Sequence, residues 1–109
     1  METNTLLLTT SSGQFLIDTS TIVRVEAMSN YCKLYFNGGK TLVTAKLLKW
    51  FEEKLPACSF VRMHRSHLVN NHYVQANQVV GGGLILCNGD FIRLSRRRRK
   101  NILNRLQAA

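Results

Sequence analysis

Basic side chains crowd one short stretch of this 109-residue chain. Seven of the 15 Lys and Arg residues lie between Arg93 and Arg105, and those from Arg96 to Lys100 are consecutive. Like charges at this spacing repel each other, and a phosphate backbone relieves the repulsion while its counterions are released. A solvated face or a basic tail is the alternative interpretation. The run is purely basic, however, and it lies at a predicted strand-to-helix junction, so it predicts a polyanionic partner such as a nucleic acid.

A second polar cluster, Arg62-Met63-His64-Arg65-Ser66-His67, combines side chains that suit the same partner. An Arg guanidinium can hold guanine or phosphate with two parallel donors, and Ser and His can reach phosphate. We expect the cluster to occupy a loop, because it follows one apolar run and precedes another at Leu68-Val69. Asn70 and Asn71 are interpreted as structural residues that hold this loop through side-chain to backbone hydrogen bonds.

Other chemistry finds little support in the sequence. The histidines His64, His67 and His72 have no neighbouring carboxylate and no helical ligand spacing, so we expect no metal site. The six acidic residues form no recognisable acid/base pair, and Gly81-Gly82-Gly83 lacks the Lys-Ser/Thr ending of a phosphate-binding loop. The chain is therefore predicted not to be an enzyme and to need no cofactor.

Three cysteines, Cys32, Cys58 and Cys87, stand far apart and form no Cys-x-x-Cys pair. We interpret them as three small buried hydrophobic residues in a protein of a reducing compartment.

Composition and length set the scale of the molecule. A mass of 12.4 kDa with 45% hydrophobic residues suits one compact domain over residues 1–109, with its core at about residues 5–106. No apolar run approaches the roughly 20 residues of a membrane-spanning helix, and the N-terminus lacks the pattern of a secretory signal. We therefore expect a cytoplasmic protein without a membrane partner. The formal net charge of +9 agrees with a polyanionic partner.

The hydrophobic pattern predicts mostly antiparallel strands, because apolar residues alternate with polar ones between turn signals. A helix is predicted after Thr44 as N-cap, with Leu47, Leu48, Phe51 and Leu55 on its buried face and Trp50 beside them, and Pro56 ends it. A partner surface around Trp50 is the alternative to core packing. Ser95 is the predicted N-cap of a final helix that buries Ile102, Leu103 and Leu106. The predicted strands cover residues 5–10, 14–18, 22–26, 31–36, 40–43, 60–63, 72–80, 84–87 and 91–94.

Four segments, in this order and spacing, resemble the signature of the LytTR DNA-binding domain family. The central one is Arg62–Asn70, which is similar to the family's Arg-x-His-Arg/Asn-Ser-x-Leu/Val-Val-Asn motif. The family's early segment is similar to residues 22–27 with Asn30-Tyr31. Its helix is similar to residues 47–56. Its closing segment is similar to Asn88-Gly89 with residues 94–97. The resemblance spans about residues 5–106. His67 departs from it, because Tyr or Phe is common at that position.

The resemblance implies a mainly β fold, an elongated domain of short antiparallel strands with one mid-chain helix and a C-terminal helix. It also implies a function, since such domains usually serve as output domains of bacterial two-component response regulators. They lie on one side of a DNA duplex, place loops in two successive major grooves, and often bind direct repeats. We therefore expect double-stranded DNA as the partner, a second copy on tandem repeats, and RNA polymerase as a further candidate.

Carried over by position, the resemblance assigns base contacts to Asn30, Arg65 and Arg97. The amide of Asn matches adenine and the guanidinium of Arg matches guanine in the major groove. Eight other residues are expected to contact phosphates or to position the loops: Lys33, Arg62, His64, Ser66, Ser95, Arg96, Arg98 and Lys100.

The alternative function is a non-specific basic module that binds RNA or an anionic surface. RNA is disfavoured because no aromatic RNA-binding pattern lies on a pair of strands. A membrane surface is disfavoured because the apolar face of the final helix is narrow and is needed for the core.

Overall fold

The computed structural model describes residues 4–108, except for the side chains of residues 75–80 and 107–108. It confirms the predicted mainly β fold with a mid-chain and a C-terminal helix. The strands are β1 Thr5–Thr10, β2 Gly13–Asp18, β3 Ile22–Met28, β4 Tyr31–Phe36, β5 Thr41–Thr44, β6 Phe60–His64, β7 His67–Asn70, β8 Val74–Val80, β9 Gly83–Leu86 and β10 Phe91–Arg93. The α-helices are α1 Leu48–Lys54 and α2 Arg99–Ala108, and short 3₁₀ turns occupy Thr19–Thr21 and Asn71–Tyr73.

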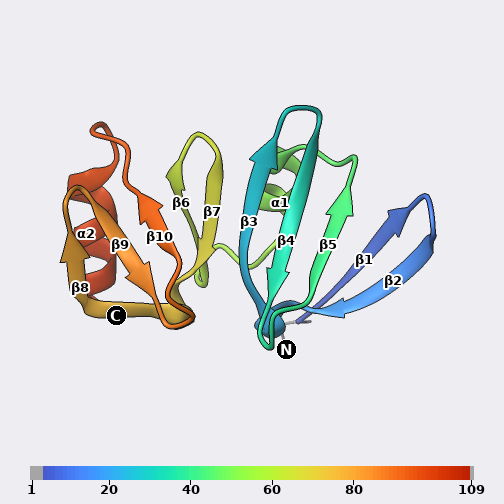
Figure 1. Ribbon diagram of the computed structural model, residues 1–109, viewed down its shortest axis with the longest axis horizontal. Helices are drawn as coiled ribbons and strands as arrows, with labels where there is room; N and C mark the ends of the chain where they lie inside the picture. The colour runs from blue at the N-terminus through green and yellow to red at the C-terminus, as the bar shows by residue number, and fades with distance from the viewer. Residues whose placement is uncertain (1–3, 109) are drawn as a thin grey trace.

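Three antiparallel sheets lie side by side along the longest axis of the molecule (Figure 1). The hairpin β1-β2 stands at one end, a central sheet has the order β5-β4-β3-β7-β6, and a C-terminal meander has the order β10-β9-β8. The described chain measures 39 × 35 × 25 Å. Helix α1 lies behind the central sheet, and α2 lies beside the meander (Figure 1).

The central sheet is buried on both faces, which divides the core in two. One cluster gathers around Phe51 of α1 and includes Leu8 of the β1-β2 hairpin. The other lies between the central sheet and the meander and includes Ile102 of α2. Successive residues Leu68 and Val69 of β7 belong to different clusters, as the alternation of side chains along a strand requires. This packing fixes the central sheet relative to both of its neighbours.

The predicted start of the first helix is wrong. Thr44 ends β5, and its hydroxyl accepts a hydrogen bond from the backbone N–H of Lys46 at 3.3 Å, so the chain turns before α1 begins at Leu48. Leu47 is the actual N-cap, without a side-chain bond, and is 65% exposed rather than part of the buried face. Leu48, Phe51 and Leu55 are buried as predicted.

The polar cluster at residues 62–67 is not a loop. Strand β6 continues through His64 and β7 begins at His67, so only Arg65 and Ser66 form the turn. The next predicted strand begins at Val74 instead of His72, because residues 71–73 form a 3₁₀ turn. Ladder hydrogen bonds between neighbouring strands thus override the polar character of this segment.

Asn70 has the structural role predicted for it. Its amide is 1% exposed, donates to the carbonyl of Ile22 at 3.0 Å and accepts from the N–H of His72 at 3.0 Å. The amide of Asn71 donates to the carbonyl of Cys58 at 3.3 Å. The prediction of three buried cysteines is wrong, because Cys58 and Cys87 are exposed and only Cys32 is buried.

Candidate nucleic-acid interface

Three connections far apart in the sequence reach one edge of the molecule. Strands β3, β6 and β10 all run toward the upper edge of Figure 1, so the connections that follow them lie there. They are residues 29–30, residues 65–66 and residues 94–98, and we call this side the loop edge. Asn30, Arg65 and Arg97 are all exposed in these connections. The fold thus brings the three predicted base-reading residues to one side.

The β3-β4 connection is as tight as an antiparallel hairpin allows. Met28 pairs with Tyr31, which leaves only Ser29 and Asn30 in the turn. Ser29 has a φ of 56°, in the left-handed region that non-glycine residues seldom adopt. Lys33 lies inside β4, paired with Glu26, and its ammonium is 5.1 Å from the centre of the Tyr35 ring. The turn therefore exposes Asn30, whereas Lys33 stands back from it.

The turn between β6 and β7 is held by the guanidinium of Arg62. Its Nε donates to the carbonyl of His64 at 2.9 Å and its Nη2 to the carbonyl of Arg65 at 2.6 Å. Its Nη1 forms an ion pair with Glu52 of α1 at 2.8 Å. Of the two roles that the sequence allowed for Arg62, the geometry thus supports loop positioning, because all three of its donor nitrogens are engaged within the protein.

Further bonds complete this turn around Arg65. The N–H of Ser66 donates to Nδ1 of His64 at 3.2 Å, and the carbonyl of Ser66 accepts from the N–H of Ala27 at 2.8 Å. Within the described part of the chain, the Arg65 side chain makes no hydrogen bond or ion pair of its own. An anchored backbone with a free guanidinium suits recognition of an external partner.

His67, where the sequence departs from the family pattern, lies under this turn. It pairs with Glu26 across β3 and β7, and its ring centre is 5.4 Å from that of His64. Burial lowers the pKa of His67, Arg24 and His64 lower it further, and the charge of Glu26 opposes the change. Its buried Nδ1 has no hydrogen-bond partner among the described residues. The site therefore favours a neutral imidazole.

The third connection, residues 94–98, is fastened to both neighbouring sheets. The N–H of Ser95 donates to the carbonyl of Met63 in β6 at 3.0 Å, and that of Leu94 donates to the carbonyl of Gly82 at 3.0 Å. Ser95 is not the N-cap of the helix itself, because α2 begins at Arg99. Its hydroxyl instead accepts from the N–H of Arg98 at 3.2 Å and closes the preceding turn. Arg96, Arg97, Arg98, Arg99 and Lys100 are all exposed along this turn and the start of α2.

A buried charge network, which the sequence analysis missed, joins the sheets that carry these connections. Arg24 of β3 is 9% exposed, pairs with Asp90 at 2.9 Å and Glu26 at 3.1 Å, and stacks 3.7 Å above the ring of Tyr35. Burial acts to raise the pKa of Glu26, but hydrogen bonds from Arg24 and Tyr35 outweigh it and hold the pKa below its usual value. The sequence did contain one signal for this network, because Arg24 is a single charged residue within the apolar segment at residues 22–25.

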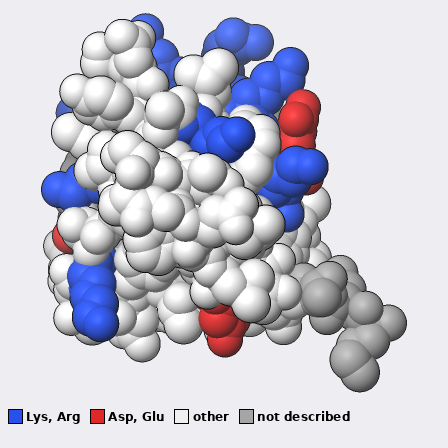
Figure 2. All heavy atoms as spheres, turned by 90° about the vertical axis from the view of Figure 1, so that its right-hand side faces the viewer, with Lys and Arg blue, Asp and Glu red and all other residues white. Residues whose placement is uncertain are grey.

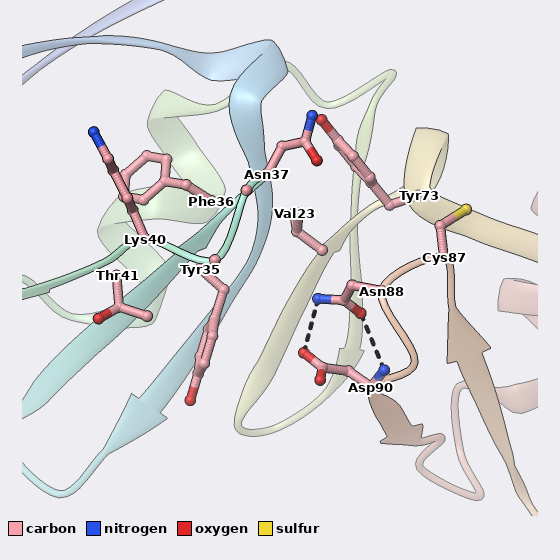
Figure 3. A pocket seen from close by; sticks show the side chains of 12 residues that line it. Val23, Tyr35, Phe36, Asn37, Lys40, Thr41, Tyr73, Cys87, Asn88 and Asp90 are labelled. Carbon is pink, nitrogen blue, oxygen red and sulfur yellow. Dashed lines mark hydrogen bonds between the residues drawn. The ribbon is translucent and has the colours of Figure 1, made fainter.

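Charge and hollows are distributed unequally over the surface. Figure 2 shows Lys and Arg side chains gathered mainly toward the upper end of the molecule, which is the loop edge of Figure 1. A hollow of about 450 Å³ lies at the opposite edge, between the turn at residues 37–40 and the turn at residues 88–90 (Figure 3). The side chain of Asn88 makes two hydrogen bonds to Asp90 there. This hollow is remote from the loop edge and belongs to a different surface.

The described residues contain no group of three or more His, Cys, Asp or Glu side chains that could hold a metal ion. None of their helices is long and apolar enough to span a membrane.

Comparisons with known proteins agree with this fold and identify a family. The family model described as the LytTr DNA-binding domain matches residues 12–107. No curated protein sequence matches the chain. Among solved structures, the chain is similar to the LytTr DNA-binding domain of a methyl-accepting/DNA response regulator from Bacillus cereus, with a TM-score of 0.79 and 24% identity over 96% of this chain and 98% of the other. At 24% identity, the structural match supports the fold alone.

Proposed function

This chain belongs to the LytTR family of DNA-binding domains, and from that premise we propose that it reads double-stranded DNA sequence-specifically as the output domain of a bacterial two-component transcriptional regulator. One observation carries the proposal: three anchored connections bring Asn30, Arg65 and Arg97 to a single basic edge. No receiver-type or catalytic chemistry is needed for this role, which requires only a rigid scaffold with exposed readers.

The arrangement of the loop edge fits this role. The three reading connections follow one another along the direction of the longest axis of the molecule (Figure 1). We propose that loops set apart in this way enter successive major grooves, which lie about 34 Å apart on one side of B-DNA, across the minor groove between them. We also propose that two copies bind direct-repeat sites in tandem.

We assign the contacts by side-chain chemistry. Asn30 pairs with adenine, and Arg65 and Arg97 pair with guanine, each through two parallel hydrogen bonds. Arg62 positions the turn that carries Arg65. The remaining predicted residues contact phosphates or support the loops, and they fix the register of the domain on the duplex. They are Lys33, His64, Ser66, Ser95, Arg96, Arg98 and Lys100.

The regulatory part of the proposal adds further partners. A domain that binds operator DNA in the cytoplasm can place RNA polymerase on, or exclude it from, a neighbouring promoter. The domain itself is proposed to have no catalytic activity, and incubation of duplex DNA with the protein and magnesium should leave the DNA uncut.

Selection from a randomised duplex library tests specific reading. The enriched duplex, a scrambled duplex of the same composition and a hairpin RNA are then compared by fluorescence anisotropy at about 50 and 200 mM salt. We expect the enriched duplex to bind most tightly, with a preference that survives at the higher salt. Equal binding to all three that collapses together with salt would overturn specific reading and leave only a basic surface.

A further inference from the structure

The end of β5 reaches the loop edge beside the β3-β4 turn. In the pairing of β4 with β5, Lys33 lies opposite Val43 and Cys32 lies opposite Thr44. The chain turns after Thr44, and Ala45 and Lys46 line the same hollow as Tyr31, the residue that follows Asn30. A fourth segment, to which the family resemblance assigned no role, thus lies next to the outermost of the three reading loops.

The β1-β2 turn meets this segment at the same corner of the molecule. Thr9, Thr10 and Ser11 share an open hollow of about 560 Å³ with Tyr31 and the segment from Val43 to Lys46. Tyr31 is 50% exposed. Hydroxyl groups of Ser, Thr and Tyr and the ammonium of Lys are side-chain types that contact DNA phosphates. We call Ser11, Tyr31 and Lys46 the β5 corner; Thr10 is left out because its hydroxyl donates to the carbonyl of Gly13 at 3.3 Å.

Lys46 carries the positive charge of this corner. Its ammonium lies 5.1 Å from the centre of the Trp50 ring. Ion pairs between described residues involve only Arg24 and Arg62 as cations, so no described carboxylate lies within 4.0 Å of the Lys46 ammonium. A cation that rests on an aromatic face keeps its charge available to an incoming anion. Figure 2, which views the molecule from the β1-β2 side, shows basic side chains along the upper end of this face.

We propose that the β5 corner is a further DNA-backbone contact that lies outside the groove read by Asn30. The order along the loop edge in Figure 1 is the β10-α2 connection, the β6-β7 turn, the β3-β4 turn and then the end of β5. The corner therefore extends the contact with the duplex beyond the last reading loop. Its contacts are to phosphate, so it adds affinity and lengthens the footprint without adding base specificity. The inference rests on the proposed function, because it requires the Asn30 loop to face DNA.

The salt dependence of binding to a mixed-sequence duplex tests the contact. The matched control is Lys40→Ala, because Lys40 is an exposed lysine in the β4-β5 turn at the opposite edge and its loss changes the net charge equally. Lys46→Ala is expected to lower the slope of log affinity against log salt by about 0.9, the value for one phosphate. Lys40→Ala is expected to leave the slope unchanged, and Lys46→Arg to restore it. Because Lys46 contacts the single tryptophan, Trp50, folding of each variant is judged by a cooperative urea transition and not by the intensity of Trp50 fluorescence alone.

Truncation of the enriched duplex from each end in turn locates the contact. We expect removal of the flank beside the Asn30 loop to weaken the wild type about threefold, and to weaken Lys46→Ala hardly at all. Removal of the other flank should affect both proteins alike. If Lys46→Ala matches Lys40→Ala in slope and in response to both truncations, the β5 corner contacts no DNA, while specific reading by the wild type still stands. If the wild type binds no duplex, the proposed function fails first and the corner fails with it.

Discussion

The Nε of Arg24 donates to Oδ2 of Asp90 over 2.9 Å, although 66 residues separate the two in the sequence. Arg24 belongs to the central strand β3, and Asp90 belongs to the turn before β10. The bond therefore joins the sheet that carries Asn30 and Arg65 to the strand that leads to Arg97. The spacing of the proposed readers depends on contacts of this kind, because the three loops belong to connections that lie far apart in the sequence.

Loss of this bond should destabilise the protein. Asp90→Ala removes one of the two acidic partners of the buried Arg24 guanidinium, so the free energy of unfolding should fall by about 1–3 kcal/mol. Urea unfolding followed by Trp50 fluorescence measures the change. The control is Glu53→Ala on the exposed side of α1. An equal effect of the two substitutions would show that the Arg24–Asp90 bond contributes nothing to stability.

Arg65→Ala and Arg97→Ala should each cost about 1–3 kcal/mol of binding free energy on the enriched duplex and far less on mixed-sequence DNA. The reason is that a bidentate contact to guanine exists only at the correct base. Anisotropy titrations on both duplexes measure the difference. A residue whose loss weakens both duplexes equally would be a phosphate contact instead.

Arg62→Lys should weaken specific binding without changing its salt dependence. Lys keeps the positive charge but cannot bond Glu52, the His64 carbonyl and the Arg65 carbonyl together, so the turn that carries Arg65 loses its support. Glu52→Gln should weaken specific binding less, because both carbonyl bonds remain. A salt slope reduced by about one in Arg62→Ala would instead identify Arg62 as a phosphate contact.

Lys100→Ala should weaken binding to every duplex by a similar factor. Its exposed ammonium at the start of α2 is proposed to meet a phosphate, so the slope of log affinity against log salt should fall by about 0.9. The measurement is a salt titration on the enriched and scrambled duplexes. An unchanged slope on both would remove Lys100 from the interface.

His67 should make the protein less stable in mild acid. Its folded-state pKa is lowered below the ordinary 6.5, chiefly by burial, so the unfolded chain binds the proton more readily as the pH falls below that value. Stability should therefore fall from about pH 7.5 to about pH 5.5, and His67→Phe should reduce this loss, as seen in urea midpoints at the two pH values. His72→Gln, at an exposed histidine, is the control. If His67→Phe follows the same pH course as the wild type, protonation of His67 does not limit stability.

Local pattern was enough to predict most of the strands. Alternation in Tyr31–Phe36 and the turn residues Asn88-Gly89 act over a few positions, so β4 and the β9-β10 turn were predictable from the sequence. The four family segments likewise identified the fold and the family, because their residues and spacing are written in the chain itself. The predicted start of the first helix was wrong, because Thr44 pairs with Cys32 of β4 and so belongs to β5. The local sequence around Thr44 does not show this pairing.

Only the tertiary structure decided which side chains act together. The resemblance predicted Asn30, Arg65 and Arg97 as base-reading residues. They lie at one edge because the three strands that precede them run in the same direction in packed sheets. The role of Arg62 depends on Glu52 of a helix, and the link between the sheets depends on Arg24 meeting Asp90. Such contacts form between elements that packing of the two apolar clusters brings together, so residue type and spacing along the chain cannot specify them by themselves.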